Sequence, residues 1–423
     1  MHRFGYVNGR LHCEKVPVEE IIRKTGTPLY LYSCNTLLDH FRQIRQAFAP
    51  VKALICFAMK ANGNLAVCRA LAKAGAGFDV VSGGELHKAL QAGANPRKIV
   101  YASVGKKPEE IEAAVKAGIL FFNVESEQEL EQIHRVCARL RRRQPVTLRL
   151  NPEVDPQTHT FISTGHKASK FGMDLKTVQR LLTRRREFPW ITFGGLHIHI
   201  GSQILEARPF RAAIQKALKV ISAARRRGIP FNTLNIGGGL GIIYDKETPQ
   251  TPADYARAVL PLLKRSRAKV ILEPGRYIAG NSGILLTRVL YLKESHGRRF
   301  AIVDAGMNDL IRPSLYGAYH RIQPVTQNGT ARGRAVRTDV VGPVCESGDF
   351  LAKNRLLPPL KAGDLLAVMS AGAYGFVMAS NYNARPRPAE VMVRGKRWCV
   401  TRRRETFQDL VRGETVPAFL SVR

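Results

Sequence analysis

Residues 55–62 read Ile-Cys-Phe-Ala-Met-Lys-Ala-Asn, an apolar run that ends at the charged amine of Lys60. Such a run is typical of a buried strand. Burial disfavours the ammonium form of a lysine and makes the amine a nucleophile for a carbonyl group. A lysine delivered by a core strand therefore indicates a Schiff base, the link that tethers pyridoxal phosphate (PLP). The alternative is a strand-end lysine whose ammonium group extends into solvent.

The same strand-like texture recurs along the chain and alternates with helical segments. The predicted strands are Ala53–Met59, Phe78–Ser82, Ile99–Val104, Leu120–Val124, Val146–Leu150, Thr192–Ile200, Thr233–Ile236 and Val270–Glu273. Between them the helical segments include Leu65–Ala74, Glu85–Ala92, Pro108–Ala117, Glu127–Leu140, Leu175–Thr183 and Phe210–Arg226. Eight such βα units predict a (β/α)8 TIM barrel, with a doubly wound sheet as the alternative.

After about residue 285 the pattern changes to short alternating runs separated by turn residues. They are Gly283–Leu292, Arg299–Val303, Arg337–Gly342, Leu365–Met369 and Ala389–Val393. This texture predicts a second, β-rich domain. The segment 1–35 also looks β-like, so we expect it to join that domain, with the barrel at 36–283 and the β-rich domain at 284–423.

The composition argues against a membrane-spanning, secreted or zinc-binding protein. The 423 residues are 45% hydrophobic, enough for two cores, and contain no apolar run long enough for a transmembrane helix. The first residues lack the apolar core of a signal peptide. The seven cysteines are scattered and form no CxxC pair, which favours reduced thiols in a cytoplasm over disulfides or a zinc site. We predict no metal and no membrane partner.

The net charge of +33 raises nucleic-acid binding as an alternative function. The basic clusters, however, each close a helical segment just before a strand, where the helix macrodipole favours cations. Aromatic residues are not interleaved with them, as base stacking requires. The clusters are Arg139 with Arg141–Arg143, Arg184–Arg186, Arg225–Arg227, and Lys264–Arg265 with Arg267. We therefore expect no nucleic-acid partner and place these clusters on the barrel face opposite the site.

In a TIM barrel the active site lies at the carboxyl ends of the strands. Glycines and polar residues gather at those predicted ends: Lys60, Ser82, Asn151, His199, Ser202, Gly237, Gly238, Gly239 and Glu273. Successive glycines let backbone N–H groups approach a phosphate. A carboxylate at this position can pair with a protonated pyridine nitrogen.

Several of these residues have more than one interpretation. Arg276 can neutralise Glu273 or bind a substrate carboxylate. His197 and His199 share one strand face. We assign His199 to the cofactor and His197 to the core, and find no further ligands for a zinc site. In the β-rich domain, Cys345 beside Glu346 suggests a proton donor, although most lone cysteines are small buried hydrophobes.

Together these motifs resemble the fold-type III PLP-dependent decarboxylases of the alanine racemase-like barrel class, and within them the diaminopimelate decarboxylase family. The matching strings run in family order over nearly the whole chain. They are 57–62, 78–86, 197–203, 237–241, 273–276, 312–316, 345–347, 373–375 and 385–388. The segment 103–107 departs from the Gly-rich, Lys-containing stretch common in that family.

The resemblance implies a role for each matched residue. Lys60 is implied to form the Schiff base, His199 to stack on the ring, Glu273 to pair with its nitrogen and Cys345 to protonate the product carbon. The implied phosphate ligands are Ser202, Gly237, Gly238, Gly239 and Tyr374, with Gly275 and Arg276 also at the cofactor. The implied substrate ligands are Arg276, Arg312, Tyr316, Glu346 and Tyr374.

The implied reaction is decarboxylation of meso-2,6-diaminoheptanedioate to L-lysine and CO₂, the last step of lysine biosynthesis. The resemblance also implies a homodimer whose active sites each combine one barrel with the partner's β-rich domain. The alternatives are a decarboxylase of the same fold acting on ornithine, arginine or carboxynorspermidine, an alanine racemase, or a catalytically inactive binding protein. Arg312 with Arg276 favours a substrate that carries a distal carboxylate.

Overall fold

The computed structural model describes residues 2–155, 169–327 and 334–420. The chain divides into two compact units. One unit is Cys34–Ser282, and the other combines His2–Ser33 with Gly283–Arg423.

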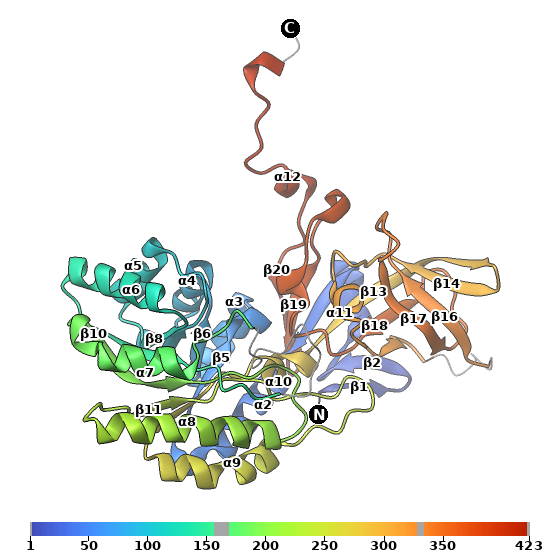
Figure 1. Ribbon diagram of the computed structural model, residues 1–423. Coiled ribbons are helices and arrows are strands. Elements are labelled where there is room, and N and C mark those ends of the chain that lie inside the picture. The colour runs from blue at the N-terminus through green and yellow to red at the C-terminus, as the bar shows by residue number, and fades with distance from the viewer. Residues whose placement is uncertain (1, 156–168, 328–333, 421–423) are drawn as a thin grey trace. The chain divides into compact units, whose positions relative to one another are not determined.

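The first unit is a closed barrel of eight parallel strands (Figure 1). In chain order they are β5 (Leu54–Ala58), β6 (Gly77–Val80), β7 (Ile99–Tyr101), β8 (Phe121–Val124), β9 (Gln144–Arg149), β10 (Ile191–His197), β11 (Thr233–Asn235) and β12 (Lys269–Leu272). The barrel closes where β12 pairs with β5, through Ile271 opposite Leu54 and Leu272 opposite Ile55. This closure confirms the predicted TIM barrel and excludes the doubly wound sheet.

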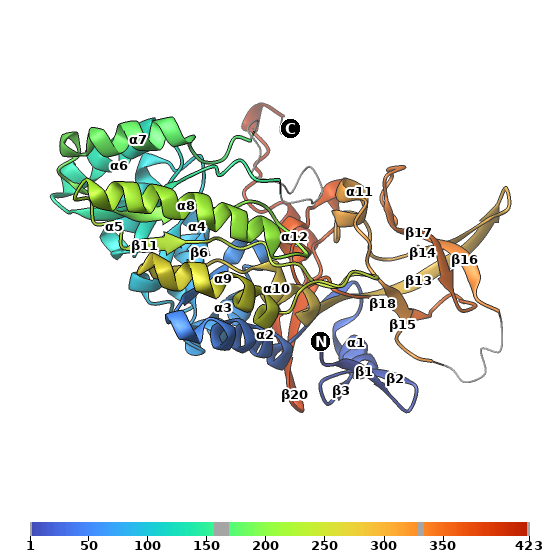
Figure 2. The same cartoon turned by 60° about the horizontal axis from the view of Figure 1, so that its bottom comes forward.

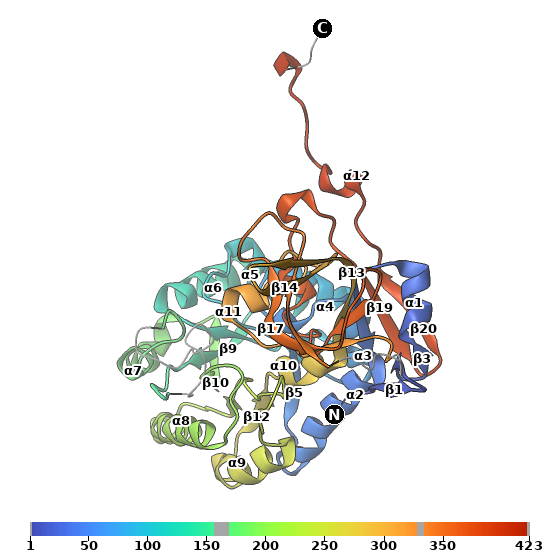
Figure 3. The same ribbon diagram turned by 90° about the vertical axis from the view of Figure 1, so that its right-hand side faces the viewer.

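Helices on the outside connect the strands (Figures 1 and 3). They are α2 (Cys34–Ala47), α3 (Leu65–Lys73), α4 (Gly83–Gln91), α5 (Pro108–Ala117), α6 (Glu127–Leu140), α7 (Leu175–Thr183), α8 (Arg208–Arg226) and α9 (Pro252–Ser266). The six helical segments named from the sequence are all present. Helix α9 is the helical segment expected before the Lys264–Arg267 cluster, and Pro261 lies inside it. It packs beside α8 (Figure 2), with Tyr255, Val259 and Leu263 buried at a spacing of four residues.

N-cap residues make the turns from strand to helix sharp. The side chains of Asn64, Ser82 and Ser126 accept hydrogen bonds from backbone N–H groups of the first turns of α3, α4 and α6. These bonds satisfy amides that have no partner inside the helix. Each helix therefore starts within a few residues of the barrel mouth.

The arginine clusters lie at the opposite ends of the helices, as predicted. Arg141 and Arg267 follow α6 and α9 in the left-handed conformation, with φ of 50° and 48°. Arg225, in the last turn of α8, donates to the backbone carbonyls of Phe231 and Ser266. The clusters thus surround the amino ends of the barrel strands.

The second unit is β-rich, as predicted. A nine-stranded sheet contains the path β17-β16-β14-β13-β4-β19-β20, with β18 pairing β13 and β15 pairing β18. The strands are β4 (Leu29–Ser33), β13 (Gly283–Ser295), β14 (Arg298–Val303), β15 (Ile322–Pro324), β16 (Val336–Val341), β17 (Phe350–Leu357), β18 (Leu365–Val368), β19 (Ala389–Arg394) and β20 (Arg397–Arg402). A smaller sheet joins β1 (Phe4–Val7), β2 (Arg10–Cys13) and β3 (Val16–Pro17).

The N-terminal segment is part of this unit. Strand β4 lies between β13 and β19, and its Leu29 and Leu31 belong to the same buried apolar cluster as Ile284, Leu286 and Val391. The segment also carries α1 (Val18–Thr25). Short helices elsewhere are α10 (Arg276–Ala279) in the barrel unit, and α11 (Arg312–Tyr316) and α12 (Phe407–Leu410) in the β-rich unit.

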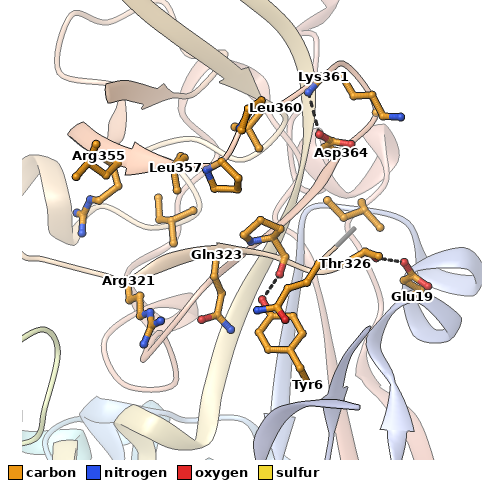
Figure 4. A pocket seen from close by; sticks show the side chains of 18 of the residues that line it. Tyr6, Glu19, Arg321, Gln323, Thr326, Arg355, Leu357, Leu360, Lys361 and Asp364 are labelled. Atoms are coloured by element: carbon orange, nitrogen blue, oxygen red, sulfur yellow. Dashed lines mark hydrogen bonds between the residues drawn. The ribbon is translucent and has the colours of Figure 1, made fainter. Parts of the chain in front are cut away.

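The β-rich unit also has an open cavity of about 730 Å³ between β15 and the segment that follows β17 (Figure 4). The Arg355 guanidinium lies 3.7 Å from the centre of the Tyr319 ring there. None of the residues predicted for the site lines this cavity. Among the described residues, no helix is both long and apolar enough to cross a membrane.

Candidate active site

Lys60 lies in the short 3₁₀ turn Met59–Ala61 that follows β5. Its Nζ is 3.3 Å from Asp79 Oδ2, on the neighbouring strand β6. The side chain of Lys60 is 39% exposed, whereas that of Asp79 is fully buried. The run buries Met59, while Lys60 reaches the open end of the barrel and is partly exposed, as in the alternative of a strand-end lysine that extends into solvent.

Asp79 is a functional candidate that the sequence interpretation missed. Burial, together with the nearby charge of Glu273, raises its pKa to about 8 against the opposing effect of Lys60. Its Oδ1 has no hydrogen-bond partner among the described residues. A carboxyl group inside the apolar run Phe78-Asp79-Val80 was the available signal, because an unpaired buried carboxylate is costly.

Glu273 follows β12 and is only 5% exposed. Its Oε1 accepts hydrogen bonds from Asn123 Nδ2 at 3.0 Å and Asn235 Nδ2 at 2.5 Å. Its Oε2 lies 3.2 Å from His197 Nε2. Burial would raise the pKa of Glu273, but His197, Lys60 and Asn235 together outweigh burial and hold it well below its usual range. Glu273 is therefore an ionised carboxylate deep in the barrel mouth.

The two histidines of β10 and its following loop both face this site. His197 is buried, as its assignment to the core predicts, and its Nε2 also lies 3.2 Å from Glu273 Oε2. His199 Nδ1 accepts a hydrogen bond of 3.2 Å from Gly238 N. Burial and the charges of Lys60 and Arg149 hold the pKa of His199 well below its usual value. A neutral ring with Nδ1 as acceptor carries its hydrogen on Nε2.

The glycine run after β11 passes close to neighbouring backbone. Gly237 and Gly239 have φ of +68° and +112°, which glycine adopts at little cost. A Cβ on Gly238 would lie 2.3 Å from the carbonyl oxygen of Glu273. The N–H of Gly239 has no acceptor among the described residues. These features fit a loop that presents its backbone to an anion.

Ser202 and Arg276 meet in this loop region. Ser202 Oγ accepts from both Nε and Nη2 of Arg276 at 3.1 Å. Arg276 Nη1 donates to the hydroxyl of Tyr244 at 2.7 Å, a contact that sequence analysis did not anticipate. Gly275 packs against the turn at Lys60, since a Cβ there would lie 3.0 Å from Ala61 Cβ. A buried guanidinium, a hydroxyl and the glycine run thus adjoin.

Two buried ion pairs support the rim of the barrel. Arg149 Nη1 lies 2.8 Å from both oxygens of Glu125. Lys106 Nζ lies 2.5 Å from Glu129 and also donates to the carbonyl of Asn123. Lys106 belongs to the segment that departs from the family pattern, and it ties that segment to β8 and α6.

The remaining predicted residues form a separate group in the β-rich unit. Arg312, at the start of α11, is buried, and its Nη1 lies 2.9 Å from His320 Nε2. Tyr316 ends the same helix. Cys345 and Glu346 are exposed in this chain. Tyr374 adopts φ of +56°, an uncommon conformation for a tyrosine that marks a functional candidate.

The barrel residues fit PLP. They provide an amine for its aldehyde, an ionised carboxylate for its ring nitrogen, and a guanidinium, a hydroxyl and a free N–H for its phosphate. Ser82 and Asn151, at other strand ends, make hydrogen bonds to nearby backbone. Ser82 caps α4, and Asn151 accepts from Glu153 N. Among the described residues, no group of three or more His, Cys, Asp or Glu side chains could hold a metal ion.

Comparisons with known proteins give a consistent result. Residues 34–280 match the family model described as pyridoxal-dependent decarboxylase, pyridoxal binding domain. The diaminopimelate decarboxylase of Aquifex aeolicus is 46% identical over 407 residues, 96% of each chain. That of Pseudomonas aeruginosa is 46% identical over 416 residues, 98% of this chain and 99% of the relative.

The solved structures to which this chain is similar include enzymes of the same name. The diaminopimelate decarboxylase of Helicobacter pylori, complexed with L-lysine, superposes with a TM-score of 0.90 at 41% identity, covering 93% of this chain and 98% of the other. The enzyme of M. jannaschii with L-lysine gives a TM-score of 0.93 at 35% identity over 99% of both chains.

Proposed function

The chain belongs to the diaminopimelate decarboxylases, a family of pyridoxal-dependent decarboxylases, and we propose which of its residues carry out the reaction. That reaction converts meso-2,6-diaminoheptanedioate to L-lysine and CO₂, with PLP as cofactor. When bound, PLP supplies an aldehyde for amine capture and a protonated ring that accepts the electrons released as CO₂ leaves. The observation that carries the assignment is the ionised, buried Glu273 at the barrel mouth that also holds Lys60.

The barrel residues hold the cofactor in this proposal. Lys60 binds the aldehyde carbon, and Glu273 faces the ring nitrogen. His199, kept neutral, covers the ring face. Ser202, the backbone of Gly237–Gly239 and Tyr374 hold the phosphate. The guanidinium of Arg276 supports the phosphate site through Ser202, and Gly275 leaves room beside the lysine turn.

Other residues are proposed to bind the substrate. Arg312 binds the distal carboxylate of the substrate, with Tyr316 and Tyr374 beside it and Glu346 at the distal amine. Arg276 adds positive charge, although its bonds to Ser202 and Tyr244 support mainly a role in organising the cofactor site. Both ends of the substrate carry the same kind of amino-acid group. Binding energy gained at the distal end therefore determines which carbon is held in position to react.

Cys345 is the proton donor in this proposal. Its Sγ delivers a proton to the carbon from which CO₂ has left, so that a C–H bond replaces the C–C bond. The backbone N–H of Cys345 donates to Asn383 Oδ1 at 2.7 Å, which holds the loop while the side chain stays exposed. The exposure of Cys345 and Glu346 supports a homodimer in which they complete the site of the partner.

A complementation experiment tests the shared site. Lys60→Ala and Cys345→Ala variants, each with strongly reduced turnover alone, are unfolded together, refolded as a mixture and assayed. In a shared-site dimer the hybrid has one intact site, so part of the activity returns. If activity stays at the sum of the two variants, each subunit builds its own site.

The substrate test is direct. Purified protein with PLP is incubated with meso-diaminopimelate, and L-lysine is measured. Lysine formation is expected, with no amine product from ornithine, arginine or carboxynorspermidine. CO₂ release from one of those substrates without lysine formation would reject the assignment of the substrate.

The seven cysteines are free. This supports a reducing compartment, and we propose the cytoplasm. Seven titratable thiols are expected in protein unfolded under non-reducing conditions. Fewer than seven would contradict this placement.

A further inference from the structure

We propose that His320 is a positioning residue for Arg312: its neutral ring accepts a hydrogen bond from the guanidinium at Nε2 and holds that cation in one orientation. The inference rests on the proposed function and deepens it, since Arg312 is there the ligand of the distal substrate carboxylate. It assigns a role to a histidine outside the matched sequence motifs. All the contacts that support it lie within the β-rich unit.

Two hydrogen bonds hold the imidazole of His320 between an arginine and a carbonyl group. Arg312 Nη1 lies 2.9 Å from His320 Nε2, and His320 Nδ1 lies 2.8 Å from the carbonyl oxygen of Met369. A guanidinium only donates hydrogen bonds, and a carbonyl oxygen only accepts them. The ring hydrogen must therefore be on Nδ1, and Nε2 must be the acceptor. A cationic ring would direct a second N–H at the guanidinium, so the ring is neutral.

The backbone around His320 fixes the position of its ring. His320 lies two residues before β15, and Met369 comes directly after β18, with which β15 pairs antiparallel. The pairing continues beyond the two strands, because Met369 N donates to the carbonyl of Arg321 at 2.8 Å. His320 is 0% exposed and Arg312 is 6% exposed. The acceptor of the guanidinium is therefore held rigidly by a strand end inside the unit.

The side chain of Arg312 needs such a partner, because its helix fixes only its backbone. Arg312 is the first residue of α11, and its carbonyl accepts from the N–H of Gly317, which ends the helix with φ of +60°. The rotatable bonds of the side chain are not restricted by that turn. A guanidinium has five N–H groups, so the bond to His320 is compatible with a two-point contact to a carboxylate.

The consequence is selective for ligands that carry the distal carboxylate. Decarboxylation removes one carboxylate of meso-diaminopimelate, so L-lysine retains the distal one, whereas 1,5-diaminopentane has neither. Loss of the orientation of Arg312 should therefore weaken binding of L-lysine and leave binding of the diamine unchanged. General damage to the fold would weaken the binding of both ligands alike.

The first measurement is isothermal titration calorimetry of the PLP-loaded protein with each of these two ligands. His320→Leu removes the acceptor and should bind L-lysine about tenfold more weakly, as expected for loss of a hydrogen bond made by a charged group. Its affinity for 1,5-diaminopentane should change by less than about twofold. In His320→Gln the side-chain oxygen can still accept from Arg312, so most of the affinity for L-lysine should be recovered. Equal changes for the two ligands in His320→Leu, or no recovery in His320→Gln, reject the positioning role.

The matched control is His12→Leu. His12 lies in β2 of the same unit, and its Nδ1 also lies close to a backbone carbonyl oxygen, that of Arg10 at 2.9 Å. Both ligands should bind to His12→Leu as they bind to the unsubstituted protein. A selective loss of L-lysine affinity in His12→Leu as large as that in His320→Leu would overturn the specific role of His320.

The second measurement is made on the unsubstituted protein. In ¹⁵N spectra of histidine-labelled protein, the resonances that are lost in His320→Gln should show a neutral ring with hydrogen on Nδ1. A cationic pattern, or hydrogen on Nε2, overturns the proposal. This readout stands even if His320→Leu fails to fold.

Arg312→Gln separates this inference from the proposed function. If Arg312→Gln binds L-lysine as tightly as the unsubstituted protein does, the proposed role of Arg312 fails. If Arg312→Gln weakens binding of L-lysine but not of 1,5-diaminopentane, while His320→Leu changes neither, only the role of His320 fails.

Discussion

Charged side chains are buried at one end of the barrel and exposed at the other. At the carboxyl ends of the strands, charged groups are buried and paired, as in Glu273 with His197 and Arg149 with Glu125. At the amino ends, the arginine clusters are mostly exposed and follow helix C-termini. Buried charges can only be retained by specific partners, whereas exposed ones are solvated. The barrel therefore has a reactive face, at the carboxyl ends of its strands, and a tolerant face, at the amino ends, where changes of charge should have little effect.

The exposed end illustrates how little such contacts need to contribute. Arg184, just after α7, contacts Glu187 at the surface. Ion pairs at the surface typically contribute about 0–1 kcal/mol each. Substitutions at the two ends of the barrel should therefore differ in effect.

Lys60→Ala should abolish the chemistry of the reactive face. We expect turnover to fall by about 10³-fold or more, because the amine that captures the cofactor is lost. Absorbance near about 420 nm in the PLP-loaded protein should also disappear. The control is Lys98→Ala, at the amino end of β7, whose Nζ donates to the carbonyl of Gly75. Equal losses in both variants would mean that the two ends do not differ.

Cys345→Ala tests the proposed proton donor. We expect turnover to fall by about 10²-fold or more while PLP binding is retained, as for loss of a general acid. Cys399→Ala, which removes another exposed thiol in β20, should have near-normal turnover. Near-normal turnover of Cys345→Ala would reject its role as proton donor.

Asp79→Asn tests the cost of a buried carboxyl group. The pKa of Asp79 rises from 3.8 when unfolded to about 8 when folded, so the folded protein binds more protons between these values. Stability from this group is therefore present at low pH and lost as pH rises from about 4 to about 8. Urea unfolding of the apoprotein from about pH 5 to about pH 9 should show a weaker decline with pH in Asp79→Asn.

The control for this experiment is Asp254→Asn. Asp254 is exposed, and its hydrogen bond with Thr251 lowers its pKa, so it stays ionised throughout the range measured. Its replacement should shift stability by a similar amount at every pH. A decline with pH that is unchanged in Asp79→Asn would contradict the buried-carboxyl assignment.

Neutralising the tolerant face should have the smallest effect. In the double variant Arg186→Gln and Arg226→Gln, both exposed, we expect the free energy of unfolding to change by less than about 0.5 kcal/mol. Turnover should stay unchanged. A salt titration of DNA binding should show weak binding that is lost near about 0.15 M salt. Tight binding at that salt concentration would restore a nucleic-acid role for these arginines.

Much of the fold was predictable because it depends on local pattern. The eight apolar runs and the helices between them follow from hydrophobic periodicity, which is encoded within a few residues. The position of Lys60 at a strand end followed from the same pattern. Helix α9, expected before the Lys264–Arg267 cluster, forms although Pro261 lies inside it, and its buried residues Tyr255, Val259 and Leu263 keep the helical spacing.

The candidate site was only partly predictable. Residue types and motif order pointed to Glu273, Ser202 and the glycine run. His197 is buried, as assigned, but its position beside Glu273 was not predictable, because a sequence shows which face of a strand two histidines share and not what that face meets. Asn123 and Asn235 belong to β8 and β11 and carry no signal in their own segments.

The sequence by itself therefore determined the barrel, the β-rich unit and the chemical groups available for catalysis, because periodicity and residue chemistry are local properties. The tertiary structure alone decided which groups meet and which stay ionised. Closure of the barrel brings Asn123, Asn235 and His197 around one carboxylate, and the charge of a buried group depends on neighbours contributed by distant strands.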